Sequence, residues 1–190
     1  MDVMDKFIKA VQRGSITEAY ALVDNEDVIS TLNMQIDVNV TVVNFIADIM
    51  ARYKCTSVTS IGSGCGVLEW FISKTIGEQV RCVDFEDKCE KFVKPACEEV
   101  VVGGRELIPG TEIQPLKLAH IPNNNMLLFV WGTRADWKHY MMQYKGSCVM
   151  FISPYDFDEN VTLDSIRAVW TNSSIQDLTG TIYDAIIVTR

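Results

Sequence analysis

The chain has 190 residues, 48% of them hydrophobic, and a formal net charge of −8. This length suits one domain with a substantial core, and no apolar run approaches the roughly 20 residues that a membrane-spanning helix needs. The acidic balance argues against nucleic acid as a partner, because nucleic-acid-binding proteins generally carry a basic stripe, and the 17 Lys and Arg residues form no dense cluster.

Cysteine usage indicates the compartment. Six cysteines show no C-x-x-C pair and no grouping with the two histidines, so the sequence predicts no metal site and buried thiols in a reducing compartment. The first residues, Met1 to Asp5, carry acids and lack the basic-then-apolar order of a signal peptide. We therefore expect a cytoplasmic protein.

The first 50 residues are predicted to be helical. Apolar stripes at helical spacing, a capping box at Ser15 to Glu18 and a cap at Asp37 or Asn39 mark the boundaries. The predicted helices cover Val3 to Val11, Ser15 to about Val23, Asp27 to Leu32, and a longer segment over Val42 to Met50. We expect residues 1–52 to form an N-terminal helical cap and residues 53–190 a core, together one domain.

A strand, a glycine turn, a helix and a second strand follow. The β-branched segment Ser57 to Ile61 predicts the first strand, and Gly62, Gly64 and Gly66 come directly after it. Apolar residues then recur at helical spacing as far as Gly77, and Val80 to Val83 predict the next strand, with Asp84 at its end. The unit is about 30 residues long, the size of a βαβ crossover.

The rest of the chain continues this alternation. A helix is predicted from about Glu86 to Val102, followed by an irregular strand that Pro115 interrupts. Trp137, Tyr140 and Tyr144 share a helix face that is predicted to be core, and the last two strands are close enough to be antiparallel. The strands predicted after Asp84 are Glu112 to Leu118, Met126 to Trp131, Ser147 to Ile152, Ser174 to about Leu178 and Tyr183 to Thr189, which makes seven in all.

The glycine turn and Asp84 together predict a nucleoside-binding edge. Glycines at a helix N-terminus let backbone N–H groups approach a ligand, with the positive end of the helix dipole behind them. An acidic residue that ends the next strand can accept hydrogen bonds from both hydroxyls of a ribose. The alternatives are a tight turn without a ligand and, for Asp84, a helix N-cap.

The spacing of the glycines narrows the class of ligand that this turn could bind. A dinucleotide fold has G-x-G-x-x-G, whereas Val67 occupies the sixth position here. The spacing G-x-G-x-G at 62, 64 and 66 resembles the first motif of the class I S-adenosylmethionine-dependent methyltransferases. The resemblance implies that residues 53–190 form a Rossmann-like core with a three-layer α/β fold. Its seven-stranded, mostly parallel, doubly wound sheet would have the last strand antiparallel beside the fifth. The resemblance also implies S-adenosylmethionine as the cofactor, with the glycine loop around its methionine end.

This resemblance assigns a set of cofactor-binding residues and shows two departures. The family usually has an acid two places before the first glycine, where this chain has Ser60, and an acid near Leu118 to Ile121, where this chain has none. Phe85 could lie against the adenine or pack under a helix, and Trp131 could flank the cofactor or cap the core. The candidate residues are Ser60, Gly62, Ser63, Gly64, Gly66, Asp84, Phe85 and Trp131.

The methyl acceptor is less defined than the cofactor. An amino-methylating enzyme of nucleic acid would carry Asp or Asn, two prolines and an aromatic residue after the fourth strand, and Phe129 to Arg134 lacks that motif. No catalytic base can be named. We therefore expect a methyltransferase that acts on a small molecule or a protein. The alternatives are a non-catalytic methyltransferase-like module that binds a protein partner and, third, an NAD(P)-dependent reductase.

Overall fold

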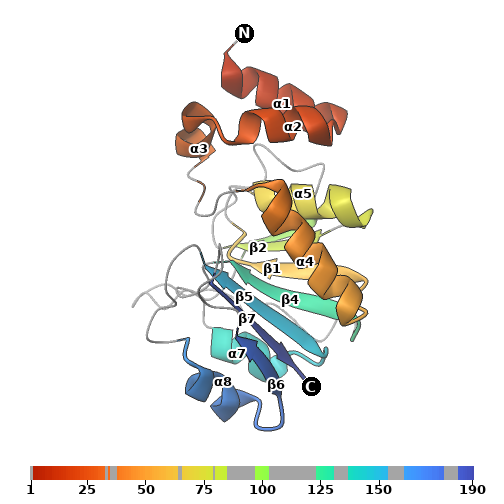
Figure 1. Ribbon diagram of the computed structural model, residues 1–190, viewed down its shortest axis with the longest axis vertical. Helices are drawn as coiled ribbons and strands as arrows, with labels where there is room; N and C mark the ends of the chain where they lie inside the picture. The colour runs from red at the N-terminus through yellow and green to blue at the C-terminus, as the bar shows by residue number, and fades with distance from the viewer. Residues whose placement is uncertain are drawn as a thin grey trace.

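The structure is a computed structural model that describes residues 2–32, 34, 38–63, 66–78, 80–84, 97–102, 123–130, 137–153, 161–177 and 184–190. Its centre is a seven-stranded sheet with the order β3-β2-β1-β4-β5-β7-β6 (Figure 1). The strands are β1 (Ser57–Ile61), β2 (Val80–Asp84), β3 (Cys97–Val102), β4 (Asn125–Val130), β5 (Cys148–Ser153), β6 (Ser174–Asp177) and β7 (Asp184–Thr189).

Strand direction confirms the predicted sheet. The strands β1 to β5 pair in parallel, with registers such as Ser60 opposite Leu128 in β4. The strand β7 lies between β5 and β6 and is antiparallel to both. The order reverses between β1 and β4, which makes the carboxyl ends of these strands the expected binding edge of the sheet.

The third strand lies where a helix was predicted. Cys97–Val102 forms β3 and pairs in parallel with β2, so the prediction of a helix as far as Val102 is wrong over these six residues. Val100 to Val102 are β-branched and suit a pleated strand, but an apolar pattern of this length fits either element. The earlier part of that predicted helix and the strand predicted at Glu112 to Leu118 lie outside the described residues.

The described helices as far as residue 143 follow the predicted order, with bounds set by their caps. Asp2 and Asn39 each accept a hydrogen bond from a backbone N–H three residues later, and Thr162 and Ser165 form a capping box. The helices are α1 (Val3–Arg13), α2 (Ile16–Val23), α3 (Glu26–Leu32), α4 (Val40–Arg52), α5 (Val67–Ile76), α7 (Trp137–Gln143) and α8 (Leu163–Val169).

The capping box predicted at Ser15 does not form. Ser15 is the N-cap of α2, but its side chain makes no capping hydrogen bond. The carboxylate of Glu18 instead pairs with the guanidinium of Arg13. A full charge on Arg13 competes with the neutral backbone N–H for this carboxylate, and ionised partners make the stronger hydrogen bonds.

The helices cover both faces of the sheet. One hydrophobic cluster joins α4 and α5 to alternate sheet residues such as Val58 and Leu128, and a second joins α7 and α8 to the other face through Ile61 and Phe129 (Figure 1). The predicted core aromatics Trp137, Tyr140 and Tyr144 are buried in the second cluster, which confirms that prediction. None of the described helices is long and apolar enough to cross a membrane.

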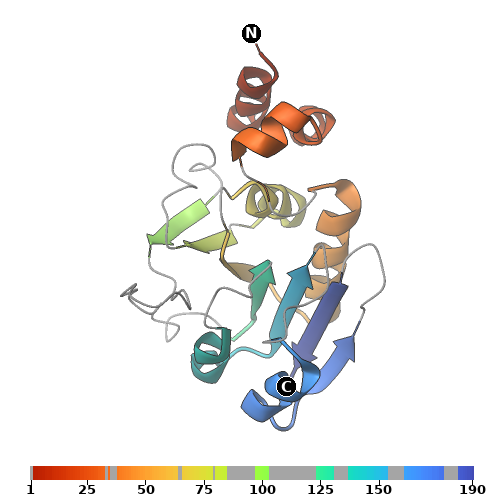
Figure 2. The ribbon, with the colours of Figure 1, turned by 90° about the vertical axis from the view of Figure 1, so that its left-hand side faces the viewer.

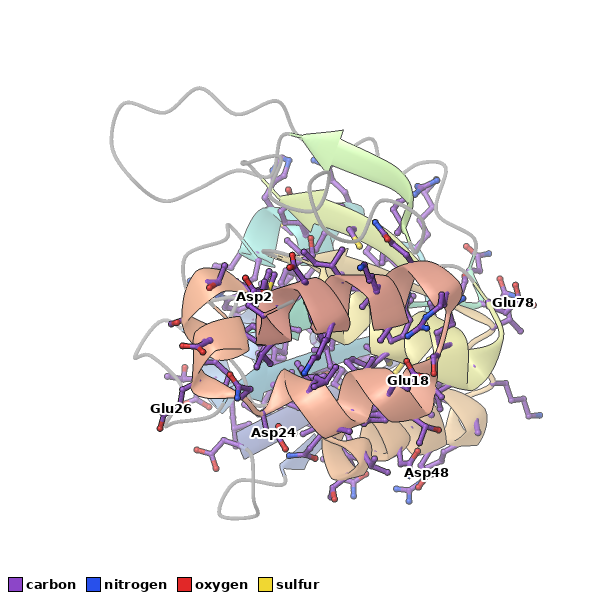
Figure 3. All side chains as sticks on the ribbon, turned by 90° about the horizontal axis from the view of Figure 1, so that it is seen from above. Asp2, Glu18, Asp24, Glu26, Asp48 and Glu78 are labelled. Carbon is purple, nitrogen blue, oxygen red and sulfur yellow. The ribbon has the colours of Figure 1, made fainter. Side chains whose placement is uncertain are left out.

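The N-terminal helices stack outside α5. Figure 2 shows α1, α2 and α3 beyond α5 on the side away from the sheet, and Figure 3 shows α1 and α2 from above, lying across the helix layer beneath them. Tyr20 of α2 stacks on Phe71 of α5 with ring centroids 4.1 Å apart. Buried apolar residues of α1, including Phe7, belong to the same cluster as α5, so this layer packs on the sheet through α5.

Candidate functional site

The glycine turn lies directly at the carboxyl end of β1. Gly62 has φ +80° and Gly66 has φ +76°, both in the left-handed region that favours glycine. The N–H of Gly66 donates to the carbonyl of Ser63 at 3.0 Å, and the carbonyl of Gly66 accepts the first bond of α5 from Trp70 at 2.9 Å. The chain thus passes from strand to helix within a few residues, which directs the N-terminus of α5 toward this edge.

Backbone contacts hold the turn against the neighbouring strands. The carbonyl of Val83 in β2 accepts from the N–H groups of Gly62, at 2.7 Å, and Ser63, at 3.2 Å. On the other side, a Cβ added at Gly62 would lie 3.8 Å from the carbonyl oxygen of Val130, the last residue of β4. The carboxyl ends of β1, β2 and β4 therefore meet at Gly62.

Asp84 ends β2 one residue after this anchor. Its backbone pairs with Val102 of β3, so it lies between the glycine turn and the neighbouring strand. The backbone of Asp84 therefore lies at the end of β2, directly beside the glycine turn.

A buried polar pair lies beneath the turn. Ser60 Oγ donates to Glu69 Oε1 at 2.6 Å, and both residues are almost fully buried, with 0% and 1% exposure. Ser60 lies on the face of β1 that packs on α5, and Glu69 is the third residue of α5. Sequence reasoning missed Glu69, although it interrupts the otherwise apolar run from Val67 to Ile72.

The structure brings together the five candidate residues that it describes. Ser60, Gly62, Ser63, Gly66 and the backbone of Asp84 meet at one edge of the sheet. The other candidates, Gly64, Phe85 and Trp131, lie outside the described residues. The described part of the predicted cofactor set therefore lies at one edge of the sheet, and its role in binding stays a prediction.

The described cysteines lie away from this edge or in the core. Cys55, Cys82 and Cys148 are buried, as the sequence predicted for its thiols. Cys55 and Cys148 lie together at the amino end of the sheet, where the neighbouring thiol and burial raise the pKa of Cys148 and keep it neutral. Within the described part of the chain, no group of three or more His, Cys, Asp or Glu residues could hold a metal ion.

Replacing Gly62 by alanine should lower the free energy of unfolding by about 1–2 kcal/mol, because an L-residue is strained in the left-handed region. The space is sufficient, since the nearest atom to the new Cβ would be at 3.8 Å. Gly77→Ala is the matched control, with φ +73° and nothing within 4 Å of the added Cβ. Denaturant unfolding should give similar losses for both variants. A much larger loss for Gly62→Ala would show that steric contact at the strand ends, not φ, sets the cost.

Comparison with known proteins relates this geometry to a fold. The sequence matches no protein-family model and no curated protein. Among solved structures, a methyltransferase from Geobacter sulfurreducens superimposes with a TM-score of 0.62 at 13% identity, covering 96% of this chain and 94% of that one. An rRNA methylase from Escherichia coli gives a TM-score of 0.56 at 10% identity, covering 99% and 75%.

A third solved structure was determined in complex with S-adenosylmethionine. A point mutant of MtNAS, in complex with S-adenosylmethionine, gives a TM-score of 0.53 at 12% identity, covering 98% of this chain and 72% of that one. At these identities the likeness concerns the fold alone. The strand order, the antiparallel β7 and these structures agree, and the chain has the fold of the class I S-adenosylmethionine-dependent methyltransferases.

Proposed function

We propose that the chain is an S-adenosylmethionine-dependent methyltransferase that acts on a small molecule or a protein. The observation that carries this proposal is the glycine turn at Gly62, where the carboxyl ends of β1, β2 and β4 meet and the N-terminus of α5 begins. In an open α/β sheet, ligands bind at this point of strand-order reversal.

The residues at this edge suit the parts of the cofactor. The glycine loop with Ser60, Ser63, Gly64 and Gly66 would surround the methionine end, as backbone N–H groups at a helix N-terminus favour a carboxylate. Asp84 would accept hydrogen bonds from the ribose hydroxyls. By the resemblance, Phe85 would lie against the adenine and Trp131 would flank the cofactor.

Methyl transfer requires little covalent chemistry from the protein itself. When bound, the cofactor would supply a methyl group attached to a positively charged sulfur, and this sulfur would leave as a neutral thioether when a nucleophile attacks the methyl carbon in line with the carbon–sulfur bond. The chain's part is to hold both reactants in that line and to exclude water, since orientation alone can lower such a barrier by about 7–11 kcal/mol. A base is needed only for an acceptor that carries a proton.

Charge and sequence support the proposed acceptor class. The chain has a net charge of −8, and Phe129 to Arg134 lacks the Asp/Asn-Pro-Pro-aromatic motif of nucleic-acid amino methyltransferases. We also propose a cytoplasmic location, which the buried thiols of Cys55 and Cys148, neither of them in a disulfide, support. Residues 1–52 and 53–190 are proposed as a helical cap and a core within one domain.

A non-catalytic binding module is the second candidate. Ser60 replaces the acid that the family usually places near the methionine amine, and such a module would keep the fold while contacting a protein partner. An NAD(P)-dependent reductase is the third candidate, and Val67 at the sixth motif position speaks against it.

Calorimetric titration of the purified chain with S-adenosylmethionine and with NADH tests these candidates. We expect S-adenosylmethionine to bind, NADH not to bind, and a Gly64→Arg variant to lose S-adenosylmethionine because the long side chain fills the loop. No binding of S-adenosylmethionine at millimolar concentration would exclude the methyltransferase. Binding without methyl transfer to any small-molecule or protein acceptor tested would favour the non-catalytic module.

A further inference from the structure

The buried pair Ser60–Glu69 is an unusual feature of the helix layer. Burying a carboxylate away from water is costly unless it is paired and hydrogen-bonded. Glu69 is 1% exposed, while its neighbours in the first turns of α5, among them Leu68 and Trp70, are buried apolar residues. A leucine at this position would add to the same cluster without the cost of burying a charge. The carboxylate is therefore better explained by a ligand than by packing.

The surroundings show how the charge is tolerated. Glu69 lies in the first turn of α5, a helix of ten residues, where the positive end of the helix dipole stabilises a negative charge. Ser60 Oγ donates to Glu69 Oε1 at 2.6 Å, a charge-assisted bond. Both groups lie directly under the glycine turn, because Ser60 precedes Gly62 by two residues and Glu69 follows Gly66 by three.

We propose that Ser60 and Glu69 act as one unit that binds the ammonium group at the amino-acid end of the cofactor. This inference rests on the proposed function. The Ser60 hydroxyl has one proton and two acceptor lone pairs, and its proton is committed to Glu69. Its oxygen is then left as an acceptor, and donation to a carboxylate strengthens it through hydrogen-bond cooperativity. The pair thus gives Ser60 the acceptor strength that a neutral hydroxyl alone lacks.

In this arrangement Ser60 contacts the ligand and Glu69 is a positioning residue that acts through it. The negative charge of Glu69 also favours a cation at the same end of the site, since the low dielectric of a buried position strengthens charge interactions. The pair therefore distinguishes ligands that carry the positively charged ammonium group from ligands that lack it. It should affect ligands that carry the amino-acid group and leave unaffected those that carry only the nucleoside and its sulfur.

Two ligands separate these contributions. S-adenosylhomocysteine carries the ammonium group on a neutral thioether, and 5′-methylthioadenosine carries the same nucleoside and thioether without the amino-acid end. We expect Glu69→Gln, which keeps the shape and removes the charge, to weaken S-adenosylhomocysteine by about 10- to 100-fold, the range for a hydrogen bond to a charged group. The affinity for 5′-methylthioadenosine should not change. Calorimetry measures both affinities.

One control variant and two further test variants complete the experiment. Glu78→Gln makes the same change on an exposed residue just after α5 and should leave both affinities unchanged. Ser60→Ala should weaken S-adenosylhomocysteine selectively, as Glu69→Gln does. The double variant Ser60→Asp with Glu69→Gln restores a carboxylate on β1 and should recover the affinity. Thermal unfolding of each variant shows that it is folded, and Ser60→Ala provides the test if Glu69→Gln is not.

The outcomes separate this inference from the function on which it rests. A wild-type chain that binds neither ligand overturns the proposed function and this inference with it. A wild-type chain that binds both, with Glu69→Gln weakening both equally or neither, overturns the inference alone. Selective loss of S-adenosylhomocysteine in both single variants, with recovery in the double variant, supports it.

Discussion

Replacing Phe71 by alanine is expected to lower the free energy of unfolding by about 3–5 kcal/mol, the usual cost of a phenylalanine-to-alanine change in a core. Phe71 is 0% exposed. Its ring stacks on Tyr20 at 4.1 Å and meets Trp70 edge-on at 4.9 Å, so truncation leaves a cavity between two layers of helices. Denaturant unfolding of the purified chain measures the loss.

The matched control for this change is an apolar residue at the surface. Met142 is 65% exposed on α7, and Met142→Ala should change stability by less than about 0.5 kcal/mol. Because Phe71 joins α2 to α5, Phe71→Ala should also make the α1–α3 layer more sensitive to limited proteolysis than the strands. A loss below about 1 kcal/mol would mean that the helix layers can close over the cavity.

Asp84→Ala should weaken binding of S-adenosylmethionine by about 100-fold or more, since each hydrogen bond to a charged group contributes about 1.5–3 kcal/mol and two ribose hydroxyls are involved. The prediction rests on the position of Asp84 at the end of β2, next to the carbonyl of Val83 that holds the glycine turn. Calorimetric titration measures the change.

The control for Asp84 is an aspartate of the surface, Asp48→Ala on α4, which should bind as the wild type does. If Asp84 instead caps a helix that follows it, the result is different. Asp84→Ala would then lower the free energy of unfolding by about 0.5–2 kcal/mol and leave the affinity unchanged.

Local signals made the centre of the fold predictable. The unit of β1, the glycine turn, α5 and β2 was predicted from β-branched residues, three glycines and an apolar helical stripe, all within about 30 residues. Its candidate residues were expected at one edge because parallel strands bring their carboxyl ends together there. The antiparallel pairing of β7 with β6 was predicted because few residues separate the two strands in the sequence.

Other features depend on which of two possible contacts forms in the folded chain, and the sequence alone does not show this. The segment Cys97–Val102 fits a helical stripe and a β-branched strand equally well, and pairing with β2 decides between them. Glu18 could bond the backbone or Arg13, and the three-dimensional approach of the two side chains decides. The Ser60–Glu69 bond joins a strand to the next helix, and only the lone acid in an apolar run indicated it.

The position of β7 has a consequence for how the sheet is completed during synthesis. The strand lies between β5 and β6 but is made after both of them. Until residues 184–189 leave the ribosome, β5 presents an open edge and β6 has no neighbour with which to pair. Open edges of this kind template pairing between chains. A delay in the synthesis of residues 184–189 should therefore raise aggregation of nascent chains more than a delay at the N-terminal helices.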